Sequence, residues 1–241
     1  MCGRYVVAMS VDDMLEEFDA VAGDTRDLAP SYNVAPTDRV PIVVEPSGGA
    51  STRELHAARW GLIPPWSTDL SGAAKMINAR VETVAEKPAY RAAIARRRCI
   101  VPASGYYEWQ RLPDGRKQPF YIHPPQRPLV MAGVFEWRRD PRLPAEDVDR
   151  WVLSTSILTT RLAADLAHIH DRMPVLSPEH ASAWLDRTDE DTAALTDLVV
   201  GTTASVAEAL APRPVGAAVG NVRINHPGLI EPFAGVVTGV R

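Results

Sequence analysis

The amino-acid sequence predicts an α+β fold, a single domain with a largely antiparallel, curled, barrel-like sheet at its core and helices flanking it. Strand-like segments dominate the middle of the chain, and helical segments follow them. The two types do not alternate as they would in a parallel βαβ sheet. Neither an internal repeat nor a long linker divides the 241 residues, so we expect one domain over residues 1–241 with a short irregular C-terminal tail.

The first part of the chain is expected to contain strands around two short helices. RYVVAM predicts a strand, and Ser10 with Asp13 has the spacing of a capping box that opens a helix in VDDMLEEF. Strand character returns at the end of SYNVAPTDRVPIVVE and in ELHAARWGL, which IPPW ends. PSGGAS predicts a turn between these two strands. KPAYRAAIARR predicts a helix with Pro88 near its first turn.

The middle of the chain predicts paired strands, and the last third predicts helices. CIVPASGYYEW is β-rich with interruptions at Pro102 and Gly105, and QRLPDGRKQPFYIH predicts a hairpin that turns at Asp114 and Gly115. The clearest strands are LVMAGVFEW and WVLSTSILTT, joined by the charged surface loop RRDPRLPAEDVDR. Beyond about Arg161, SPEHASAWLD and EDTAALTDLVV predict helices, and VGNVRINHPGLIEP is irregular.

Composition excludes several classes of protein. The chain has no apolar run long enough to span a membrane and no secretory signal pattern. Its two cysteines, Cys2 and Cys99, form neither a disulfide framework nor a metal cluster, so we expect a reducing, cytoplasmic location, associated with the nucleoid if the protein is bacterial. Motifs for dinucleotide, P-loop, serine-hydrolase and zinc-protease chemistry are all missing, and no cofactor is expected.

The net charge of −4 argues against a uniformly basic surface but allows a local basic groove. One candidate is a run of basic side chains: Arg80, Lys87, Arg91, Arg96, Arg97 and Arg98. Its charges alone favour a solvated helix face with a basic last turn, which the helix dipole stabilises, over a binding groove.

Several segments hold polar and aromatic residues that a core does not need. INAR contains Asn78 and Arg80, and GYYEW places Glu108 between aromatic residues. His170 follows His168 in a spacing that suits a metal, but no further ligand pattern completes such a site, and no metal is expected. Taken singly, each residue is more often structural. The sequence does not show that a carboxylate, a histidine and the N-terminal cysteine meet in one site.

Taken in order, a series of segments resembles the SOS response-associated peptidase (SRAP) family of abasic site processing proteins. The segments are MCGRY, YNVAPT, RWGLIPPW, INARVET, RCIVPASGYYEW, PFYIH, AGVFEW, STSILTT, IHDRMPVLS and NVRINHPGLIEP. They extend from residue 2 to about residue 232. Two stretches depart from the family pattern: the loop between Trp137 and Trp151 is long and charged, and NVRINHPG is looser than usual. Neither includes an implied catalytic position.

The resemblance implies a monomeric, suicide-type enzyme that covalently traps abasic sites in single-stranded DNA and shields them during the SOS response to DNA damage, without a membrane partner. It implies Cys2 as the crosslinking nucleophile, exposed once Met1 is removed. The implied catalytic residues are Cys2, Asn78, Glu108 and His170. The implied DNA-binding residues are Arg4, Trp60, Trp66 and Arg80. The family name also implies a hydrolase or peptidase class.

An N-terminal cysteine suits this chemistry because it carries an amine and a thiol on one residue. A ring-opened abasic site presents an aldehyde, which the amine attacks to form a Schiff base. An α-amine has a pKa of about 7.7–8.0, so more of it is neutral at pH 7 than of a lysine amine. The thiol can then close a five-membered thiazolidine, which protects the adduct from β-elimination.

Three alternatives stay open at this point. The same amine and thiol fit an N-terminal-nucleophile peptidase that cleaves its own leader or releases itself from a DNA–peptide adduct. A non-catalytic single-strand-binding module would leave Cys2 incidental. Slow thiazolidine closure would allow an abasic-site lyase side activity through the Schiff base.

Overall fold

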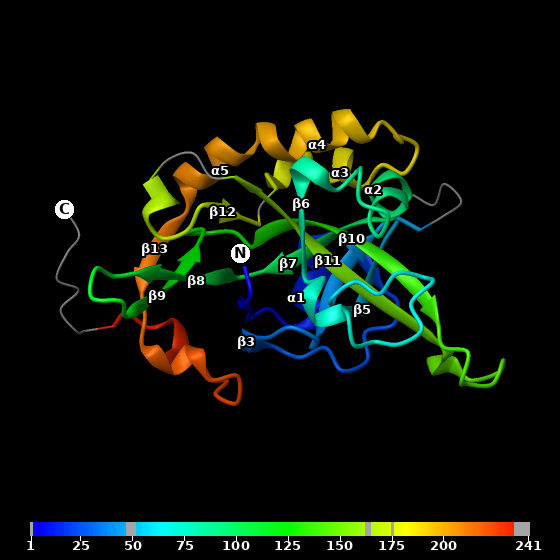
Figure 1. The fold of residues 1–241 in the computed structure, drawn as a ribbon, viewed down its shortest axis with the longest axis horizontal. Helices are drawn as coiled ribbons and strands as arrows, with labels where there is room; N and C mark the ends of the chain where they lie inside the picture. The colour runs from blue at the N-terminus through cyan, green and yellow to red at the C-terminus, as the bar shows by residue number, and fades with distance from the viewer. Residues whose placement is uncertain (1, 47–51, 162–164, 175, 234–241) are drawn as a thin grey trace.

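The computed structural model describes residues 2–46, 52–161, 165–174 and 176–233, which form two sheets and a layer of helices (Figure 1). The expected turn in PSGGAS lies almost entirely outside the described residues. The expected α+β fold with a curled, largely antiparallel sheet is confirmed.

Five strands close a barrel. They are β4 (Arg39–Val44), β5 (Arg53–Trp60), β7 (Arg98–Ala103), β10 (Leu129–Arg139) and β11 (Trp151–Arg161). Neighbours pair antiparallel in the order β11-β10-β7-β4-β5, and a parallel pairing of β11 with β5 completes the ring. Three short strands join it from outside: β2 (Ala20–Ala22), β6 (Asn78–Arg80) and β12 (Arg172–Met173).

The second sheet ties down the start of the chain. It contains β13 (Ala211–Pro214), β9 (Lys117–His123), β8 (Gly105–Arg111), β1 (Tyr5–Val7) and β3 (Ser31–Val34), in that order and all antiparallel. Because β1 pairs on both edges, the N-terminal strand lies inside the sheet rather than at a frayed end.

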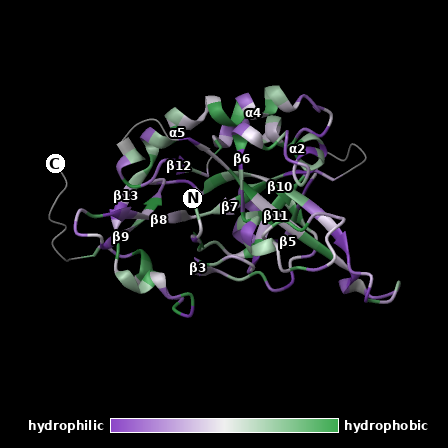
Figure 2. Cartoon of the chain, viewed as in Figure 1, coloured by the Kyte–Doolittle hydropathy of each residue, from purple (hydrophilic) through white to green (hydrophobic). Residues whose placement is uncertain are grey.

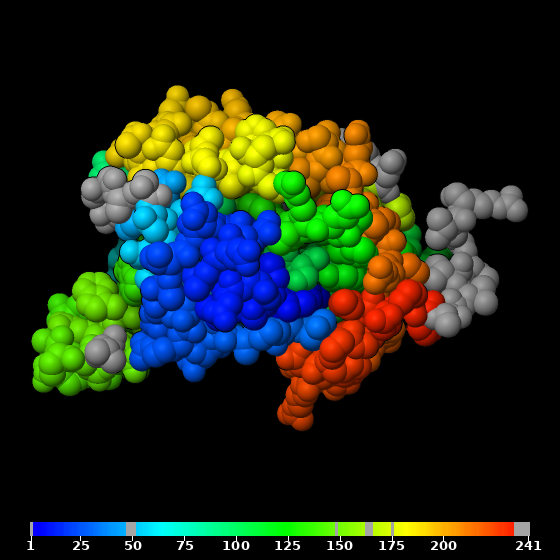
Figure 3. Space-filling model, turned by 180° about the vertical axis from the view of Figure 1, so that it is seen from behind, coloured from blue at the N-terminus to red at the C-terminus, as the bar shows by residue number. Residues whose placement is uncertain are grey.

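Side chains of β1 point alternately into two cores, as the period of a strand requires. Tyr5 and Val7 join the main core that fills the barrel and the space beside it. Val6 faces the opposite side, where Tyr107 and the C-terminal residues Val219 and Leu229 form a smaller cluster. Apolar segments follow the strands through the middle of the molecule in Figure 2, and Figure 3 shows the N-terminal and C-terminal segments side by side on the rear face.

The helices are short. They are α1 (Val11–Glu17), α2 (Arg91–Arg96), α3 (Ala181–Leu185), α4 (Thr192–Gly201) and α5 (Thr203–Ala209). Helices α2 to α5 lie along one side of the sheets (Figure 1). The capping box at α1 is present, with the Ser10 side chain accepting from the Asp13 N–H and the Asp13 carboxylate accepting from the Ser10 N–H. Helix α2 begins after Pro88, which therefore does not occupy its first turn.

Single-turn helices complete the chain between these elements. They are η1 (Ala73–Lys75), η2 (Val81–Thr83), η3 (Val148–Arg150), η4 (Asp165–His168), η5 (Pro178–His180), η6 (Ala217–Gly220) and η7 (Pro227–Ile230). The last two lie in the C-terminal segment expected to be irregular. The β8–β9 hairpin turns at Gly115, whose φ of 84° requires glycine, as expected. Pro102 lies inside β7 rather than interrupting it.

The basic run around α2 is mostly structural. Arg98 is buried and donates to the carbonyl oxygens of five residues: Ile94, Ala95, Trp184, Asp186 and Asp189. Arg97 pairs with Glu136 at 2.5 Å, and Arg96 pairs with Glu190 at 3.1 Å. The run was expected to be a solvated helix face with a basic last turn; this holds for Arg96 in the last turn of α2 but is wrong for Arg98, which is buried in β7. Within the described residues, no helix is long and apolar enough to cross a membrane.

Candidate active site

Strand β1 holds Cys2 in the interior of the protein. The Cys2 side chain is fully buried, and its Sγ–H donates to the Arg4 carbonyl at 3.7 Å. Burial raises the pKa of the thiol well above its usual range, and the nearby Glu108 carboxylate raises it further. The thiol is therefore protonated at neutral pH, a state in which a cysteine is a poor nucleophile.

Asn78 fixes the backbone next to this thiol. It starts β6, which lies parallel to β11 with Asn78 paired to Ile157. Its Nδ2–H donates to the Cys2 carbonyl at 2.6 Å. The Asn78 Oδ1 is buried and has no hydrogen-bond partner among the described residues. The amide thus holds Cys2 with its donor end and presents an acceptor within the site.

Glu108 reaches the same site from β8. Tyr5 pairs with Tyr106 across β1 and β8, so the continued register brings Glu108 beside Gly3. The Glu108 side chain is buried, and burial raises the pKa of its carboxyl group above the usual value. A raised pKa suits a carboxyl group that exchanges protons near neutral pH.

His170 faces Glu108 from the segment between η4 and β12. Its Nδ1 lies 4.0 Å from the Glu108 Oε1 and 3.1 Å from the Asp171 Oδ1. The backbone N–H of Arg172 donates to this Nδ1 at 3.0 Å. When Nδ1 accepts that bond, the neutral ring carries its proton on Nε2, which is then the donor nitrogen.

The histidine segment is itself anchored by a buried arginine, Arg172, which was not among the predicted site residues. Arg172 makes two hydrogen bonds to the Glu82 carboxylate, at 2.7 and 3.1 Å, and also donates to Thr159. Only its place two residues after His170 pointed to it, and sequence spacing does not reveal a partner ninety positions away. Arg172 and Glu82 are positioning residues for His170.

The structure brings the four predicted catalytic residues together. Of the predicted DNA-binding residues, some are exposed and others are engaged or buried within the protein. Arg80 is exposed at the end of β6, and Trp66 is 64% exposed in the loop after β5. Arg4 is partly buried and donates to Asn33 at 2.7 Å and to the Val219 carbonyl at 2.9 Å. Arg4 therefore already joins β1 to β3 and to the C-terminal segment.

The expectation that Trp60 lines the DNA path needs correction. Its side chain is fully buried, packs edge-on against Tyr5 with 5.0 Å between ring centroids, and donates from Nε1 to the Ile77 carbonyl at 2.9 Å. An indole that fills the core has no face for a base to stack on. Trp60 instead supports β1 and the segment that carries Asn78.

Gly61 directs the loop that carries Trp66. Its φ of 126° favours glycine, and a Cβ at this position would lie 2.4 Å from the Ala73 carbonyl oxygen. Arg138 from β10 then holds the loop by donating to the Ser67 and Thr68 carbonyls, both at 2.9 Å. The exposed indole of Trp66 thus projects from a loop fixed at both ends.

No group of three or more histidine, cysteine, aspartate or glutamate side chains suited to a metal ion occurs among the described residues, and His168 and His170 belong to no such group. The fold and the site define a class of protein: an α+β barrel whose second residue, a cysteine, is buried beside an asparagine, a carboxyl group and a histidine. A family model described as SOS response associated peptidase (SRAP) matches residues 1–222. The chain therefore belongs to the SRAP family.

Several proteins with related sequences match most of this chain. The abasic site processing protein YoqW of Bacillus subtilis is 36% identical over 235 residues, covering 96% of this chain and 99% of the relative. YoaM of the same organism, with the same description, is 38% identical over 190 residues, covering 77% and 79%. The abasic site processing protein HMCES of Xenopus tropicalis is 30% identical over 268 residues, covering 94% and 77%.

Solved structures share the fold. A crystal structure of a Bacteroides thetaiotaomicron protein has a TM-score of 0.81 and 24% identity, covering 96% of this chain and all of that one. A phage-related protein of Bordetella bronchiseptica has a TM-score of 0.66 and 30% identity, covering 89% and 94%. The first of these likenesses speaks to the fold alone.

Proposed function

We propose that this protein senses abasic sites in single-stranded DNA and captures them covalently through Cys2, after removal of Met1, as part of a DNA damage response. The observation that carries the proposal is the anchoring of the Cys2 carbonyl by Asn78 at 2.6 Å, in the same site as Glu108 and His170. The abasic site processing names of the relatives support it.

The reaction joins three groups and releases one water. The Cys2 α-amine attacks the C1′ aldehyde of the ring-opened sugar to give a carbinolamine. Loss of hydroxide with a proton, as water, forms the imine. The Cys2 thiol then adds to the imine carbon, and its proton ends on the ring nitrogen of the thiazolidine. No oxidant or cofactor is needed to balance these steps.

Glu108 and His170 supply the proton transfers. Opening the sugar requires a proton at the ring oxygen, and His170 can donate one from Nε2. Dehydration of the carbinolamine requires a proton for the leaving hydroxyl, and the raised pKa of Glu108 suits that carboxyl group to proton transfer there. Asn78 holds the Cys2 backbone so that amine and thiol meet the same carbon.

The exposed Arg80 and Trp66 are the proposed contacts to DNA. The guanidinium group of Arg80 suits a phosphate beside the lesion, and the Trp66 indole suits stacking with a neighbouring base. A single strand fits better than a duplex because the reacting carbon has to reach a buried residue, and an unpaired nucleotide can turn out of the strand.

The test is a denaturing gel of the protein incubated with single-stranded DNA that contains one abasic site. The wild-type protein should give a slow-migrating covalent species, undamaged DNA should give none, and Cys2→Ala should abolish the stable species. Cys2→Ser keeps the amine without the thiol, so it should give an adduct only after borohydride reduction, with strand cleavage if the Schiff base acts as a lyase. An undiminished adduct from Cys2→Ala would refute the proposal.

A peptidase function is the second candidate, because the family is described as a peptidase. The same site could act on a peptide bond, including that of Met1, through the Cys2 amine or thiol. Turnover of peptides in the absence of DNA, lost in Cys2→Ala, would favour that function over covalent capture.

A further inference from the structure

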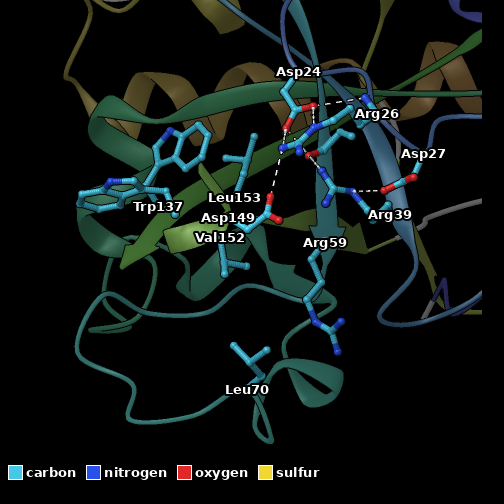
Figure 4. Close-up of a pocket in the computed structure, with 12 residues that line it drawn as sticks. Asp24, Arg26, Asp27, Arg39, Arg59, Leu70, Trp137, Asp149, Val152 and Leu153 are labelled. Carbon is cyan, nitrogen blue, oxygen red and sulfur yellow. Dashed lines mark hydrogen bonds and ion pairs between the residues drawn. The ribbon is translucent and has the colours of Figure 1, made fainter. Parts of the chain in front are cut away.

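A second cavity lies between the β10–β11 hairpin and the barrel. Its volume is about 850 Å³. Strand β11 pairs with β5 only at Ser154 and Thr155, so the first residues of β11 leave the barrel, and the cavity opens beside them. Figure 3 shows the hairpin projecting from the body, and Figure 4 shows the lining residues. This volume lies within the range of small-molecule sites in proteins.

This cavity is separate from the Cys2 site. Asn78 pairs with Ile157 on β11, whereas the cavity lining ends at Leu153 on the same strand. Four residues of extended strand correspond to about 13 Å. None of the residues around Cys2 lines the cavity, so a ligand there would be bound by different side chains.

Two arginines of like charge line the same wall of the cavity. Arg39 and Arg59 are directly opposite in the antiparallel β4–β5 ladder, an arrangement that like charges destabilise. Among the described residues, Arg39 makes two long ion pairs, 3.7 Å to Asp24 and 3.9 Å to Asp27, and donates to the Ala57 carbonyl at 3.4 Å. In Figure 4 the two guanidinium groups point apart, with Arg39 turned toward Asp27 and Arg59 turned toward Leu70.

Arg59 differs from Arg39 in having no partner for its charge or for its Nε–H among the described residues. It makes no ion pair among the described residues, and its buried Nε has no hydrogen-bond partner there. Arg26 does not share this property, because it holds Asp24 at 2.8 Å and Asp149 at 3.3 Å. The three aspartates of the lining therefore face Arg26 and Arg39, and Arg59 keeps its charge for a ligand.

The opposite wall carries two exposed tryptophans. Trp137 is 40% exposed and Trp151 is 52% exposed. Trp137 pairs with Leu153 and Arg139 with Trp151, so the two indoles are diagonal neighbours on one face of the hairpin. Trp137 and the arginines lie on opposite sides of the cavity in Figure 4. Aromatic faces opposite guanidinium groups suit a ligand with a planar ring and a negative charge.

We propose that this cavity binds a nucleotide, with its phosphate on Arg59 and its base against Trp137 or Trp151. A nucleotide carries both features, whereas an acidic peptide would use the arginines but leave the two indoles without a planar partner. The ligand is either a free mononucleotide or one unit of a longer single strand. The site does not depend on the proposed reaction of Cys2.

The test uses the Cys2→Ala protein, so that covalent capture does not contribute, and measures binding by isothermal titration calorimetry. The probes are deoxyadenosine monophosphate, inorganic phosphate, a short oligothymidylate without lesions and an oligoglutamate peptide. The variants are Arg59→Gln and Trp151→Ala. The matched control is Arg111→Gln, an exposed arginine on β8 that does not line the cavity.

We expect saturable binding of deoxyadenosine monophosphate that weakens by about tenfold or more in Arg59→Gln and in Trp151→Ala and is unchanged in Arg111→Gln. Inorganic phosphate should bind more weakly than the nucleotide and should not respond to Trp151→Ala. If the oligothymidylate binds more tightly than the mononucleotide and responds to both cavity variants, the ligand is a strand; if it does not, the ligand is a free nucleotide.

Two results would overturn the proposal. One is that neither nucleotide probe binds, or that the affinity of the nucleotide is the same in Arg59→Gln and Trp151→Ala as in the protein without these changes. The other is binding of the oligoglutamate peptide alone, which would make the cavity a peptide site. Failure here would leave the Cys2 reaction untouched, because that reaction is read on a denaturing gel with the wild-type protein.

Discussion

After removal of Met1, Cys2 would carry two nucleophiles, an α-amine and a thiol, in different chemical environments. Burial keeps the thiol protonated, and Asn78 fixes the carbonyl of the same residue. In the proposed reaction the amine therefore attacks first, and the thiol adds only after the imine carbon has been brought next to it. A buried, protonated thiol is also protected from oxidation before DNA arrives. The order of the two bonds follows from the environment of one residue.

Replacing Asn78 tests the positioning of this residue. We expect Asn78→Ala to slow adduct formation by about tenfold, because losing one hydrogen bond worth about 1–1.5 kcal/mol lets the Cys2 backbone move. The measurement is a single-turnover time course on a denaturing gel. Asn33→Ala is the matched control, because Asn33 binds Arg4 and the C-terminal segment rather than Cys2. Equal rates for Asn78→Ala and the wild type would contradict the assigned role.

The buried carboxyl group of Glu108 predicts a pH-dependent stability. Because burial raises its folded-state pKa, Glu108 stabilises the protein best below about pH 4.3, and that contribution is lost as the pH rises through the folded-state value. We therefore expect Glu108→Gln to unfold at a higher temperature than the wild type at about pH 8, with a difference that shrinks in acid.

Glu82 is the control for this prediction, because its pKa is shifted in the opposite direction. Burial raises the pKa of Glu82, but its hydrogen bonds to Arg172 outweigh that effect and lower it. Its contribution is present above about pH 4.3 and lost as the pH falls through the folded-state value. Glu82→Gln should therefore unfold at a lower temperature than the wild type at about pH 8. Thermal unfolding that shifts in the same direction for both variants would contradict the two assignments.

The sequence predicted which residues belong to the candidate site better than it predicted whether a side chain is buried or which side chains it contacts. Cys2, Asn78, Glu108 and His170 were each suggested by residue type and family resemblance, and the structure shows that they meet. Trp60 was expected at the DNA and lies in the core, because an aromatic residue in a strand gives no sign of which face is buried. Arg172 and Glu82 were missed, because a buried ion pair between distant segments has no sequence signal.

At the scale of elements, short strands rather than long helices position the site. Strand β1 brings Cys2, β6 brings Asn78, β8 brings Glu108, and the segment before β12 brings His170. Strand β1 pairs with the longer β8, and β6 and β12 both pair with the longer β11. The sequence predicted the long strands and the β8–β9 hairpin, since their alternation and turn residues are local. It did not predict β6 or β12, whose two or three residues are too few for a pattern.

Arg98 shows how an element can be anchored by one side chain. Its guanidinium group donates to carbonyl oxygens at the ends of α2 and α3, away from solvent. We expect Arg98→Ala to lower the free energy of unfolding by at least about 3 kcal/mol, since several buried carbonyls lose their donor. Arg96→Ala should change it by no more than about 0.5 kcal/mol, because Arg96 and Glu190 are exposed.

Equilibrium unfolding in urea measures both variants. A loss for Arg98→Ala no larger than that for Arg96→Ala would mean that the buried contacts of Arg98 contribute no more to stability than an exposed ion pair of the basic run.

At the scale of the whole molecule, a net negative protein has to bind a polyanion through a few local charges. The net charge is −4, and several arginines are engaged within the protein, so Arg80 stands out as an exposed cation near the site. We expect the affinity for lesion-free single-stranded DNA to fall with salt, and Arg80→Gln to reduce the slope of log K against log salt by about 0.7.

Fluorescence anisotropy at several salt concentrations measures this slope. Arg96→Gln is the matched control and should leave it unchanged, because Arg96 is paired with Glu190. A slope that is the same in Arg80→Gln and the wild type would remove Arg80 from the DNA contacts. Charge composition predicted that binding has to be local, but only the folded chain distinguishes exposed arginines such as Arg80 from those engaged within the protein.

The intact mass of the DNA adduct tests the central claim most directly. The proposed chemistry predicts a species whose mass equals that of the protein without Met1 plus the abasic DNA minus one water, formed without borohydride and stable on heating. The bond should map to Cys2 after digestion. An adduct that keeps Met1, or one attached through any other residue, would contradict thiazolidine formation by the N-terminal cysteine.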